Sequence, residues 1–425
     1  MNKVLIITYY WPPSGGAGVQ RWLKFSKYLP DFGWDPVILT VDPEYAAYPV
    51  TDFSLNADLP LSIKVYYTRA TNYFSIYKKD RSKIPTAGFA NIIDNSFKGK
   101  ILRFVRGNFF LPDPRKGWNK YAFKKACELI DTEGIRNIIT TSPPHSTQLI
   151  GLNIKKKYPE VNWIADLRDP WTDIYYYNQF YPTFISRWID QQYEKSVLGK
   201  ADKIITVGTS LKNLISMKVK GVESKTEVIT NGFDEDDFSK ISPFNPPGFI
   251  ITYVGTLSDI YPVEGLLNAL KIFKENGNEI VLRFIGTVSQ NQRDLIQSNP
   301  GNSILEFIPN VDHSEAIKYM LKTSALLLII PDHQSSKSIL TGKLFEYIAS
   351  GKPIICLGPV DGDAAVILNN TGYGKTFSYN DSKEISEYLS FLISGNPIMK
   401  RISPGSFSRR ELTKKIIPLL SDLKE

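Results

Sequence analysis

The chain has 425 residues, a formal net charge of +8 and a hydrophobic content of 42%. This length exceeds the roughly 250 to 300 residues at which a single hydrophobic core stops growing, so two domains are expected. No apolar run approaches the roughly 20 residues needed to span a bilayer, which excludes an integral membrane protein. The only cysteines are Cys127 and Cys356, which excludes a disulfide scaffold and a cysteine-based zinc site.

The first half of the chain alternates short apolar runs with longer amphipathic stretches, as is typical of βαβ units around a parallel sheet. The apolar run after Lys3 is too short for a signal peptide, so we interpret it as the first strand of a cytoplasmic protein. The predicted strands are 3–8, 36–40, 63–67, 137–141, 163–166, 203–207 and 227–230. Helical spacing predicts helices over 19–29, 118–131, 146–157, 184–198 and 210–218.

A second series of strands and helices begins after a segment rich in Ser, Pro and Asn, which reads as a linker. Its predicted strands are 250–254, 280–285, 304–307, 325–330 and 353–356, and its predicted helices are 263–274, 314–321 and 343–349. A lone amphipathic helix is expected over 407–423. The predicted domains are therefore 1–235 and 249–402, with a linker over 236–248 and a C-terminal segment over 403–425 that returns to the first domain.

Basic residues gather between Lys98 and Lys125, where they alternate with phenylalanines and Trp118. The net charge of +8 favours an anionic partner. A basic and aromatic segment over 98–125 is typical of peripheral proteins that rest on anionic lipid headgroups. A solvated helix face above core aromatics is an equally good interpretation. No recognisable nucleic-acid module accompanies the charge, so nucleic acid is not an expected partner.

A glycine-rich turn between Pro12 and Arg21 follows the first strand and opens a helix. Gly15 and Gly16 would let the backbone approach a phosphate, whose charge the helix N-terminus also favours. The third glycine of the dinucleotide fingerprint is missing, so an NAD-binding loop is not predicted. The alternative is a turn that is needed only for strand-to-helix packing.

Four motifs in this order resemble the GT-B glycosyltransferases of family 4, in their bacterial polysaccharide-type subgroup. They are the strand, glycine pair and helix at the start, Asn231-Gly232-Phe233-Asp234, Tyr253-Val254-Gly255-Thr256-Leu257, and Lys343-Leu344-Phe345-Glu346-Tyr347 followed by Gly351-Lys352-Pro353. The resemblance covers nearly the whole chain. It implies an α/β fold with two Rossmann-like domains that face a central cleft, and a C-terminal helix that packs back on the N-terminal domain.

The resemblance also implies a donor site in the second domain. Glu346 matches a glutamate that accepts both ribose hydroxyls, which suits the two acceptor oxygens of a carboxylate. Thr341, Gly342, Lys343 and Leu344 stand where a phosphate-binding turn is expected, and Gly255 and Thr256 open the domain opposite it. Lys343 would supply positive charge to the leaving diphosphate. A solvent-facing glutamate and a surface lysine are the alternatives.

Two cations that are usual in the family are replaced in this chain. Thr256 stands where an arginine is customary, and Glu264 stands where a lysine precedes Gly265. A further customary glutamate, eight residues before the ribose glutamate, is Ser338. We infer that Lys343, with Arg21 or Arg168, takes over part of the phosphate binding, or that the donor adopts a different pose. Loss of catalysis is the alternative.

Polar and charged side chains also follow two strands of the first domain, at the sheet edge where open α/β folds bind ligands. His145 comes after the strand 137–141, and the resemblance implies a role for it near the sugar and acceptor. Asp166, Arg168 and Asp169 end the next strand. Asp169 or Asp166 could bind acceptor hydroxyls or act as a base, and Arg168 could meet phosphate. A helix-capping or packing role for His145, and an internal ion-pair network for the charges, are the alternatives.

The remaining polar motifs carry less chemistry. The loop 112–118 resembles one seen in part of the same family, and we place it near the acceptor side without a chemical step. His313 and His333 lack metal-ligand spacing, and we interpret both as non-functional. No metal site and no cofactor are predicted, since the nucleotide-sugar is a co-substrate.

The predicted activity is transfer of a sugar from a nucleotide-sugar donor to a hydroxyl of a glycan or polyprenyl-linked glycan, in cell-surface polysaccharide synthesis. Retention at the anomeric carbon, assisted by the departing phosphate, follows from the resemblance. A nucleotide-sugar 2-epimerase shares the architecture and is one alternative. A catalytically degenerate protein that binds sugar nucleotides is the other, motivated by Thr256 and Glu264.

Overall fold

The computed structural model of this chain describes residues 2–60, 62–73, 96–239, 246–274, 280–299, 303–395 and 401–421. Two parts of the predicted segments, residues 240–245 of the linker and residues 422–425 at the C-terminus, lie outside the described residues.

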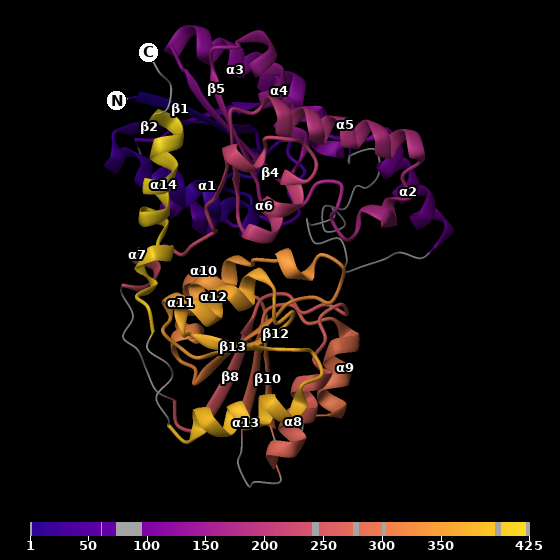
Figure 1. Cartoon of the computed structure of the whole chain (residues 1–425), viewed down its shortest axis with the longest axis vertical. Helices are drawn as coiled ribbons and strands as arrows, with labels where there is room; N and C mark the ends of the chain where they lie inside the picture. Colours follow the sequence, from indigo (N-terminus) through magenta and orange to yellow (C-terminus); the bar gives the residue numbers. More distant parts are fainter. Residues whose placement is uncertain are drawn as a thin grey trace. The chain divides into compact units, whose positions relative to one another are not determined.

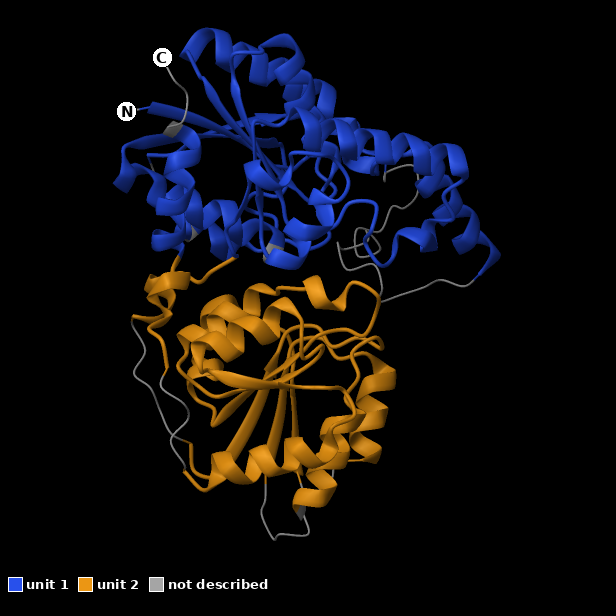
Figure 2. Ribbon diagram, in the orientation of Figure 1, with its two compact units in different colours: residues 1–230, 409–425 blue, residues 231–408 orange. Residues whose placement is uncertain are grey.

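The chain forms two compact units (Figure 2). Unit 1 comprises residues 1–230 and 409–425, and unit 2 comprises residues 231–408. The units divide after Thr230 and not after 235, because the residues that follow Thr230 bond to unit 2. The Asn231 side chain donates to the Leu340 carbonyl over 3.3 Å, and the Phe233 amide donates to the Phe407 carbonyl over 3.1 Å.

The described part of unit 1 contains a parallel sheet in the order β3-β2-β1-β4-β5-β6-β7. Its strands are β1 (Asn2–Ile7), β2 (Trp34–Val41), β3 (Lys64–Thr68), β4 (Asn137–Ser142), β5 (Asn162–Leu167), β6 (Lys203–Thr206) and β7 (Thr226–Val228). Its helices are α1 (Ala17–Tyr28), α2 (Phe97–Phe109), α3 (Asn119–Glu133), α4 (Ser146–Lys157), α5 (Phe184–Lys200), α6 (Thr209–Ser216) and α14 (Arg409–Ser421), as Figure 1 shows.

Unit 2 repeats this plan with a parallel sheet in the order β10-β9-β8-β11-β12-β13. Its strands are β8 (Phe249–Val254), β9 (Ile280–Ile285), β10 (Ser303–Ile308), β11 (Ala325–Ile329), β12 (Ile354–Leu357) and β13 (Gly374–Phe377). Its helices are α7 (Glu235–Phe238), α8 (Glu264–Lys274), α9 (Gln290–Ser298), α10 (His313–Leu321), α11 (Gly342–Ala349), α12 (Asp363–Thr371) and α13 (Ser382–Ile393).

The central strands are buried along their whole length, which explains why they read as continuous apolar runs in the sequence. Every residue of β4, β5 and β11 is buried, as expected for a parallel sheet that is covered on both faces. The two predicted Rossmann-like domains are confirmed. Six of the elements named above were not predicted, namely α2, α7, α9, α12, β13 and α13.

The C-terminal helix packs on unit 1, as predicted. The side chains of Leu412 and Ile416 on α14 belong to the buried core of that unit. The Arg409 guanidinium donates to the Gln20 carbonyl over 2.6 Å, which joins α14 to α1. The helix therefore completes the first hydrophobic core. Among the residues described, no helix combines the length and the hydropathy needed to cross a lipid bilayer.

Strand order reverses once in each sheet, between β1 and β4 in unit 1 and between β8 and β11 in unit 2. At such a point the connections leave in opposite directions, and a crevice forms at the carboxyl ends of the strands. The glycine-rich turn and His145 follow β1 and β4. Gly255 follows β8, and the segment that leads to Lys343 follows β11.

Gly265 on α8 allows a close backbone contact that we expect to be essential for unit 2. A Cβ atom at this position would lie 1.9 Å from the Tyr379 carbonyl oxygen. We expect Gly265→Ala to destabilise the protein by about 1–3 kcal/mol or more, because backbone must move to admit the methyl group. Thermal unfolding of the purified protein measures the effect. The matched control is Gly199→Ala on α5, where no atom lies within 4 Å, and its transition should be unchanged or slightly raised. Equal transitions for both variants would contradict the packing of α8.

Candidate functional site

In unit 2, Lys343 reaches from the start of α11 to the carboxyl end of β8. Its Nζ lies 4.5 Å from the ring centroid of Tyr253 and 3.2 Å from the Tyr253 hydroxyl oxygen. A Cβ atom on Gly255 would lie only 2.9 Å from this Nζ. The structure therefore brings Gly255 and Lys343 together, and Lys343 can occupy this place because residue 255 has no side chain.

The surroundings of Lys343 make its charge easy to remove. Burial lowers the pKa of Lys343 to about 8, and the nearby Glu346 carboxylate acts in the opposite direction. Its neighbour Tyr253 is itself buried, and the Tyr253 hydroxyl donates to the Thr256 carbonyl over 2.7 Å. An ammonium held against a buried aromatic ring in this way is well placed to pair with an anion, because burial strengthens the attraction.

Glu346 lies one helical turn after Lys343 and is partly exposed, with 21% of its side chain accessible. Its Oε1 lies 3.0 Å from Nε2 of His313, at the start of α10. The other ring nitrogen of His313 lies 3.9 Å from a carboxylate oxygen of Asp237. The sequence interpreted His313 as non-functional; in the structure its ring lies between the carboxylates of Glu346 and Asp237.

The first turn of α11 offers further donors. Thr341 is its N-cap residue in an extended conformation, but the Thr341 side chain does not cap the helix. The Thr341 hydroxyl is buried without a hydrogen-bond partner among the described residues. Amides in the first turn of a helix have no intrahelical acceptor, and they favour an anion. Leu344 differs from the prediction, because its side chain is fully buried in the core and its amide donates to the Thr341 carbonyl.

The two positions that lack the customary cations have other contacts here. Thr256 is exposed, and its carbonyl accepts the Tyr253 hydroxyl. The Glu264 carboxylate accepts a hydrogen bond from the Val263 amide over 3.0 Å, at the start of α8. Glu264 therefore serves the N-terminus of its own helix, where a carboxylate is favourable.

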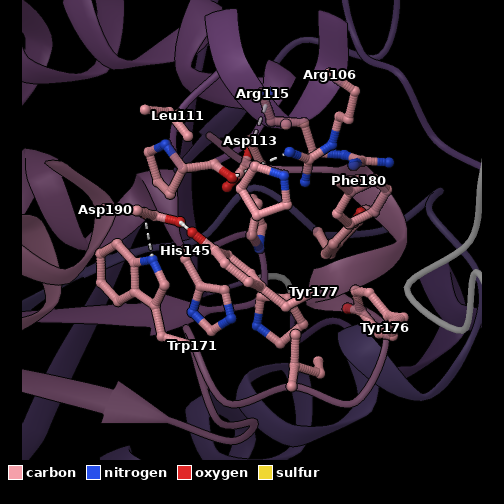
Figure 3. Close-up of a pocket in the computed structure, with 17 residues that line it drawn as sticks. Arg106, Leu111, Asp113, Arg115, His145, Trp171, Tyr176, Tyr177, Phe180 and Asp190 are labelled. Atoms are coloured by element: carbon pink, nitrogen blue, oxygen red, sulfur yellow. Dashed lines mark hydrogen bonds between the residues drawn. The ribbon is translucent and has the colours of Figure 1, made fainter. Parts of the chain in front are cut away.

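Unit 1 contains a cavity at the edge of its sheet (Figure 3). The lining side chains come from the loop after β1, from α2, from the loop before α3, from the turn between β4 and α4, and from the segment 171–190. His145 and Asp190 line this cavity together with Arg106 and Arg115. The structure therefore places the predicted His145 beside the loop 112–118 and beside Asp190, which the sequence did not indicate.

Asp113 fixes the position of His145. One carboxylate oxygen of Asp113 accepts the Ser146 amide over 2.8 Å. The other accepts the Ser146 hydroxyl over 2.8 Å and the Arg115 amide over 2.9 Å. Asp113 thus caps α4, the helix that begins directly after His145. This gives the loop 112–118 a physical role that the sequence left open.

His145 is neutral and stacked in the cavity wall. Its ring lies 4.9 Å from the ring of Trp171 at an interplanar angle of 16°. Burial lowers the pKa of His145 to about 4, so the imidazole is uncharged near neutral pH. The side chain does not cap its helix, and Nδ1 is buried without a hydrogen-bond partner among the described residues. The capping alternative is therefore wrong.

Asp190 on α5 is an ionisable group in the same cavity wall that sequence reasoning missed. It accepts hydrogen bonds from the indole nitrogen of Trp171 over 2.8 Å and from the Tyr177 hydroxyl over 3.0 Å. Burial raises the pKa of Asp190 to about 6. Asp190 therefore holds Trp171 in the plane on which His145 stacks.

The pair Arg21 and Asp166 forms an internal network. Asp166 is fully buried and accepts hydrogen bonds from the Arg21 guanidinium, from the Trp22 indole and from the Thr141 hydroxyl. Arg21 also donates to the carbonyls of Ile229 and Thr230. The suggestion that Arg21 meets phosphate is therefore wrong, as is a role for Asp166 toward an acceptor, because both groups are saturated inside the core.

The side chains of Arg168 and Asp169 differ in how many of their hydrogen-bonding groups already have a partner within the protein. The Arg168 guanidinium donates to the carbonyls of Ser142 and Gly18 over 2.9 and 3.1 Å. It thereby ties the glycine-rich turn to the turn before His145. The Asp169 carboxylate has no hydrogen-bond partner among the described residues, and burial raises its pKa. Asp169 can therefore still accept hydrogen bonds. Most of the donor groups of Arg168, in contrast, are already used within the protein.

Part of the glycine-rich turn is already hydrogen-bonded within the protein. The Gly15 amide donates to the Val50 carbonyl over 2.9 Å. It is therefore not free to bind a phosphate, contrary to the prediction. Gly16 precedes α1 with a φ of +88°, and no side chain caps this helix. Across the described ranges, no group of three or more His, Cys, Asp or Glu side chains is arranged to hold a metal ion.

A family assignment follows for the part of the chain that holds Gly255, Lys343 and Glu346. Residues 234–408 match the sequence profile of the family described as Glycosyl transferases group 1. The match covers most of unit 2. A search of curated proteins with the sequence finds no significant match.

Solved structures resemble this chain over nearly its whole length. A glycosyltransferase from Rickettsia africae covers 99% of this chain and 98% of its own, with 14% identity and a TM-score of 0.61. Anabaena HepE in complex with UDP and glucose covers 99% and 100%, with 13% identity and a TM-score of 0.59. A Listeria monocytogenes protein assigned to the UDP-N-acetylglucosamine 2-epimerases covers 98% and 94%, with 10% identity and a TM-score of 0.54. The fold of the chain is GT-B, as predicted.

We expect Arg21 to matter for stability alone. Arg21→Met leaves the Asp166 carboxylate buried without its partner, which should destabilise the protein by about 3–5 kcal/mol. Chemical denaturation measures the loss. The matched control is Arg410→Met, which removes an exposed ion pair with Asp31 and should cost about 0–1 kcal/mol. A stable Arg21→Met protein that binds nucleotide more weakly would contradict the structural role.

Proposed function

We propose that this chain is a retaining glycosyltransferase that moves a sugar from a nucleotide-sugar donor to a hydroxyl of a glycan or lipid-linked glycan. The observation that carries the proposal is the pairing of Lys343 and Glu346 on the first turns of α11, inside the range that matches glycosyl transferases group 1. Residues three apart share one face of a helix. A cation and a partly exposed carboxylate on one face suit a ligand that carries both a diphosphate and a ribose.

In the proposed donor site, Glu346 accepts the two ribose hydroxyls, and His313 holds its carboxylate in place from 3.0 Å away. Lys343 and the amides at the start of α11 receive the diphosphate. As the bond to the sugar breaks, negative charge grows on the leaving phosphate, and a cation fixed beside it stabilises the transition state. The UDP in the similar HepE structure supports a nucleotide as the leaving group.

Unit 1 would serve the acceptor. The neutral His145 lines the cavity beside Trp171, and Asp169 has an acceptor group that is not used within the described residues. A neutral imidazole and a carboxylate can both bind sugar hydroxyls. Retention needs no enzyme nucleophile if the departing phosphate assists attack on the same face of the sugar. We assign His145 and Asp169 to acceptor and sugar positioning on this basis, with protein cations in place of a metal.

A nucleotide-sugar 2-epimerase is the second candidate, and the likeness to the Listeria protein favours it. The two functions differ in what they require. An epimerase converts a nucleotide sugar without an acceptor, whereas a transferase releases the free nucleotide, slowly by hydrolysis when no acceptor is present. A thermal-shift screen against UDP, GDP, ADP and CMP sugars identifies the donor. Analysis of the products with that donor then decides between the functions, and no response to any donor would favour the degenerate protein.

Glu346 should be responsible for recognition of the ribose. Once the donor nucleotide is known, Glu346→Ala should weaken its binding by about tenfold to a hundredfold for each ribose hydroxyl that it accepts, since each hydrogen bond to a charged group contributes about 1.5–3 kcal/mol. Wild-type protein should also prefer the ribonucleotide to its 2′-deoxy form, and the variant should not. Titration calorimetry measures both. Glu315→Ala, an exposed glutamate on α10, is the control. A variant that keeps the full ribose preference would rule out this role of Glu346.

Lys343 should make donor binding depend on pH. Because burial lowers its pKa to about 8, the side chain is charged below pH 8 and increasingly neutral above it. Affinity for the nucleotide sugar should therefore be constant near pH 7 and fall above pH 8, by at most about tenfold per pH unit. Lys343→Met should bind weakly throughout, without this fall. Lys337→Met removes an exposed lysine and should keep the wild-type profile. A flat wild-type profile between pH 7 and 9 would remove Lys343 from the phosphate site.

A further inference from the structure

Helix α2 exposes an apolar row that no described part of the chain covers. Phe97, Ile101 and Phe104 are 79%, 46% and 42% exposed. Their spacing of four and three residues places them on one face of the helix. A helix on the surface of a globular protein normally turns such a face toward the core. This row is therefore a candidate contact surface.

A second apolar group begins α5, next to the end of α2. Phe184, Ile185 and Trp188 are 84%, 67% and 55% exposed. The two helices meet at Asn108, whose side chain accepts the Thr183 amide over 2.7 Å and donates to the Tyr181 carbonyl over 3.0 Å. Figure 1 shows α2 beside the start of α5. We call these side chains the α2–α5 surface: Phe97, Ile101, Phe104, Phe184, Ile185 and Trp188.

The charges on α2 select the chemistry of the partner. The helix carries Lys98, Lys100, Arg103 and Arg106 and has no acidic residue. By their positions on the helix, Lys98 and Lys100 flank the apolar row, and both are exposed. Exposed aromatic side chains between lysines are suited to the boundary between anionic headgroups and acyl chains, where rings enter the apolar layer and ammonium groups meet phosphate.

We propose that the α2–α5 surface binds the headgroup region of an anionic lipid bilayer, with the long axis of α2 in the membrane plane. The surface differs in extent from the segment 98–125 indicated by the sequence. Trp118 is buried at the start of α3, and Lys125 pairs with Glu128, so that half of the segment is not part of it. Phe184, Ile185 and Trp188 join it from a distant part of the chain.

The position of the α2–α5 surface indicates what membrane binding would do for the enzyme. This step rests on the function proposed above. Arg106 and Gly107 of α2 line the cavity of unit 1, and so do Phe180 and Asp190. The Arg106 guanidinium lies 4.4 Å from the ring centroid of Phe180. One helix thus presents aromatics to the bilayer and forms part of the cavity wall. An acceptor whose lipid lies in the bilayer would have its head near this cavity.

Vesicle flotation tests the proposal on the full-length protein, without nucleotide or acceptor. We expect binding to vesicles of phosphatidylcholine mixed with phosphatidylglycerol, and little binding to phosphatidylcholine alone. Two double variants, Phe97→Ser with Phe104→Ser and Phe184→Ser with Trp188→Ser, should each weaken binding about tenfold or more. Their control is Phe53→Ser with Met217→Ser, which removes side chains of 70% and 79% exposure elsewhere in unit 1.

A second pair of double variants tests the contribution of the lysines to lipid binding. Lys98→Glu with Lys100→Glu should abolish the preference for phosphatidylglycerol. Lys322→Glu with Lys383→Glu changes the net charge equally and should leave the preference intact. Thermal unfolding confirms that each variant is folded, and donor hydrolysis measured on the same samples reports the enzyme separately.

Three results would overturn the proposal, and none of them bears on the transferase reaction. The first is absence of binding to anionic vesicles. The second is equal binding by the wild-type protein and both aromatic variants. The third is a wild-type dimer in gel filtration that these variants convert to a monomer, since the α2–α5 surface would then serve contact between copies of the chain. Loss of donor hydrolysis with retained vesicle binding would instead contradict the proposed function alone.

Discussion

The reversal of strand order in the two parallel sheets is the constraint on which the candidate site depends. Where β8 and β11 lie side by side, their connections depart in opposite directions, and backbone segments meet at the carboxyl edge. In unit 2 this brings Gly255 against Lys343, with Nζ occupying the space of the missing side chain. The position of the cation thus follows from the topology together with one glycine. Unit 1 repeats the arrangement at β1 and β4, where His145 takes its place from the helix that Asp113 caps.

Buried charge is used in two different ways in this chain. Arg21 and Asp166 lie in the core of unit 1, where every strong donor is matched by a carboxylate or carbonyl oxygen. Such a pair stabilises one packing arrangement and leaves nothing for a ligand. Lys343 is bound only by a tyrosine hydroxyl and a ring face among the described residues. Burial lowers the pKa of Lys343 because it disfavours the charged amine, a cost that a nearby anion would offset. This incomplete pairing is why we propose Lys343, and not Arg21, as a cation that binds a ligand.

Much of the fold could be predicted from the sequence, because buried parallel strands read as apolar runs. β4, β5 and β11 are buried at every residue and were predicted within one residue at each end. The helices α9, α12 and α13 were missed. Segments near the sheet edge, such as β13 with its exposed lysine, were also missed because their apolar signal is short.

The site was harder to predict wherever it depends on contacts between distant residues. Lys343 and Glu346 lie in one sequence motif, so their proximity could be predicted from the sequence. His313 contacts Glu346 across 33 positions of the sequence, and Arg21 contacts Asp166 across 145. No spacing rule reaches so far, so one contact was missed and the other was replaced by a wrong role. Asp190 was missed for the same reason, since Trp171 and Tyr177 become its partners only when α5 packs beside them.

The exposed aromatics of α2 and the cavity of unit 1 share one helix. Asn108, near the end of α2, is bonded to the segment that starts α5, and Arg106 is stacked on Phe180 within that same packing. A tilt of α2 toward a surface would therefore displace Arg106 and Phe180, both of which line the cavity. Conversely, a ligand that orders these two side chains would fix the angle at which Phe97 and Phe104 are presented. If the α2–α5 surface binds a bilayer as proposed, α2 is the element through which that binding would be coupled to a ligand in the cavity.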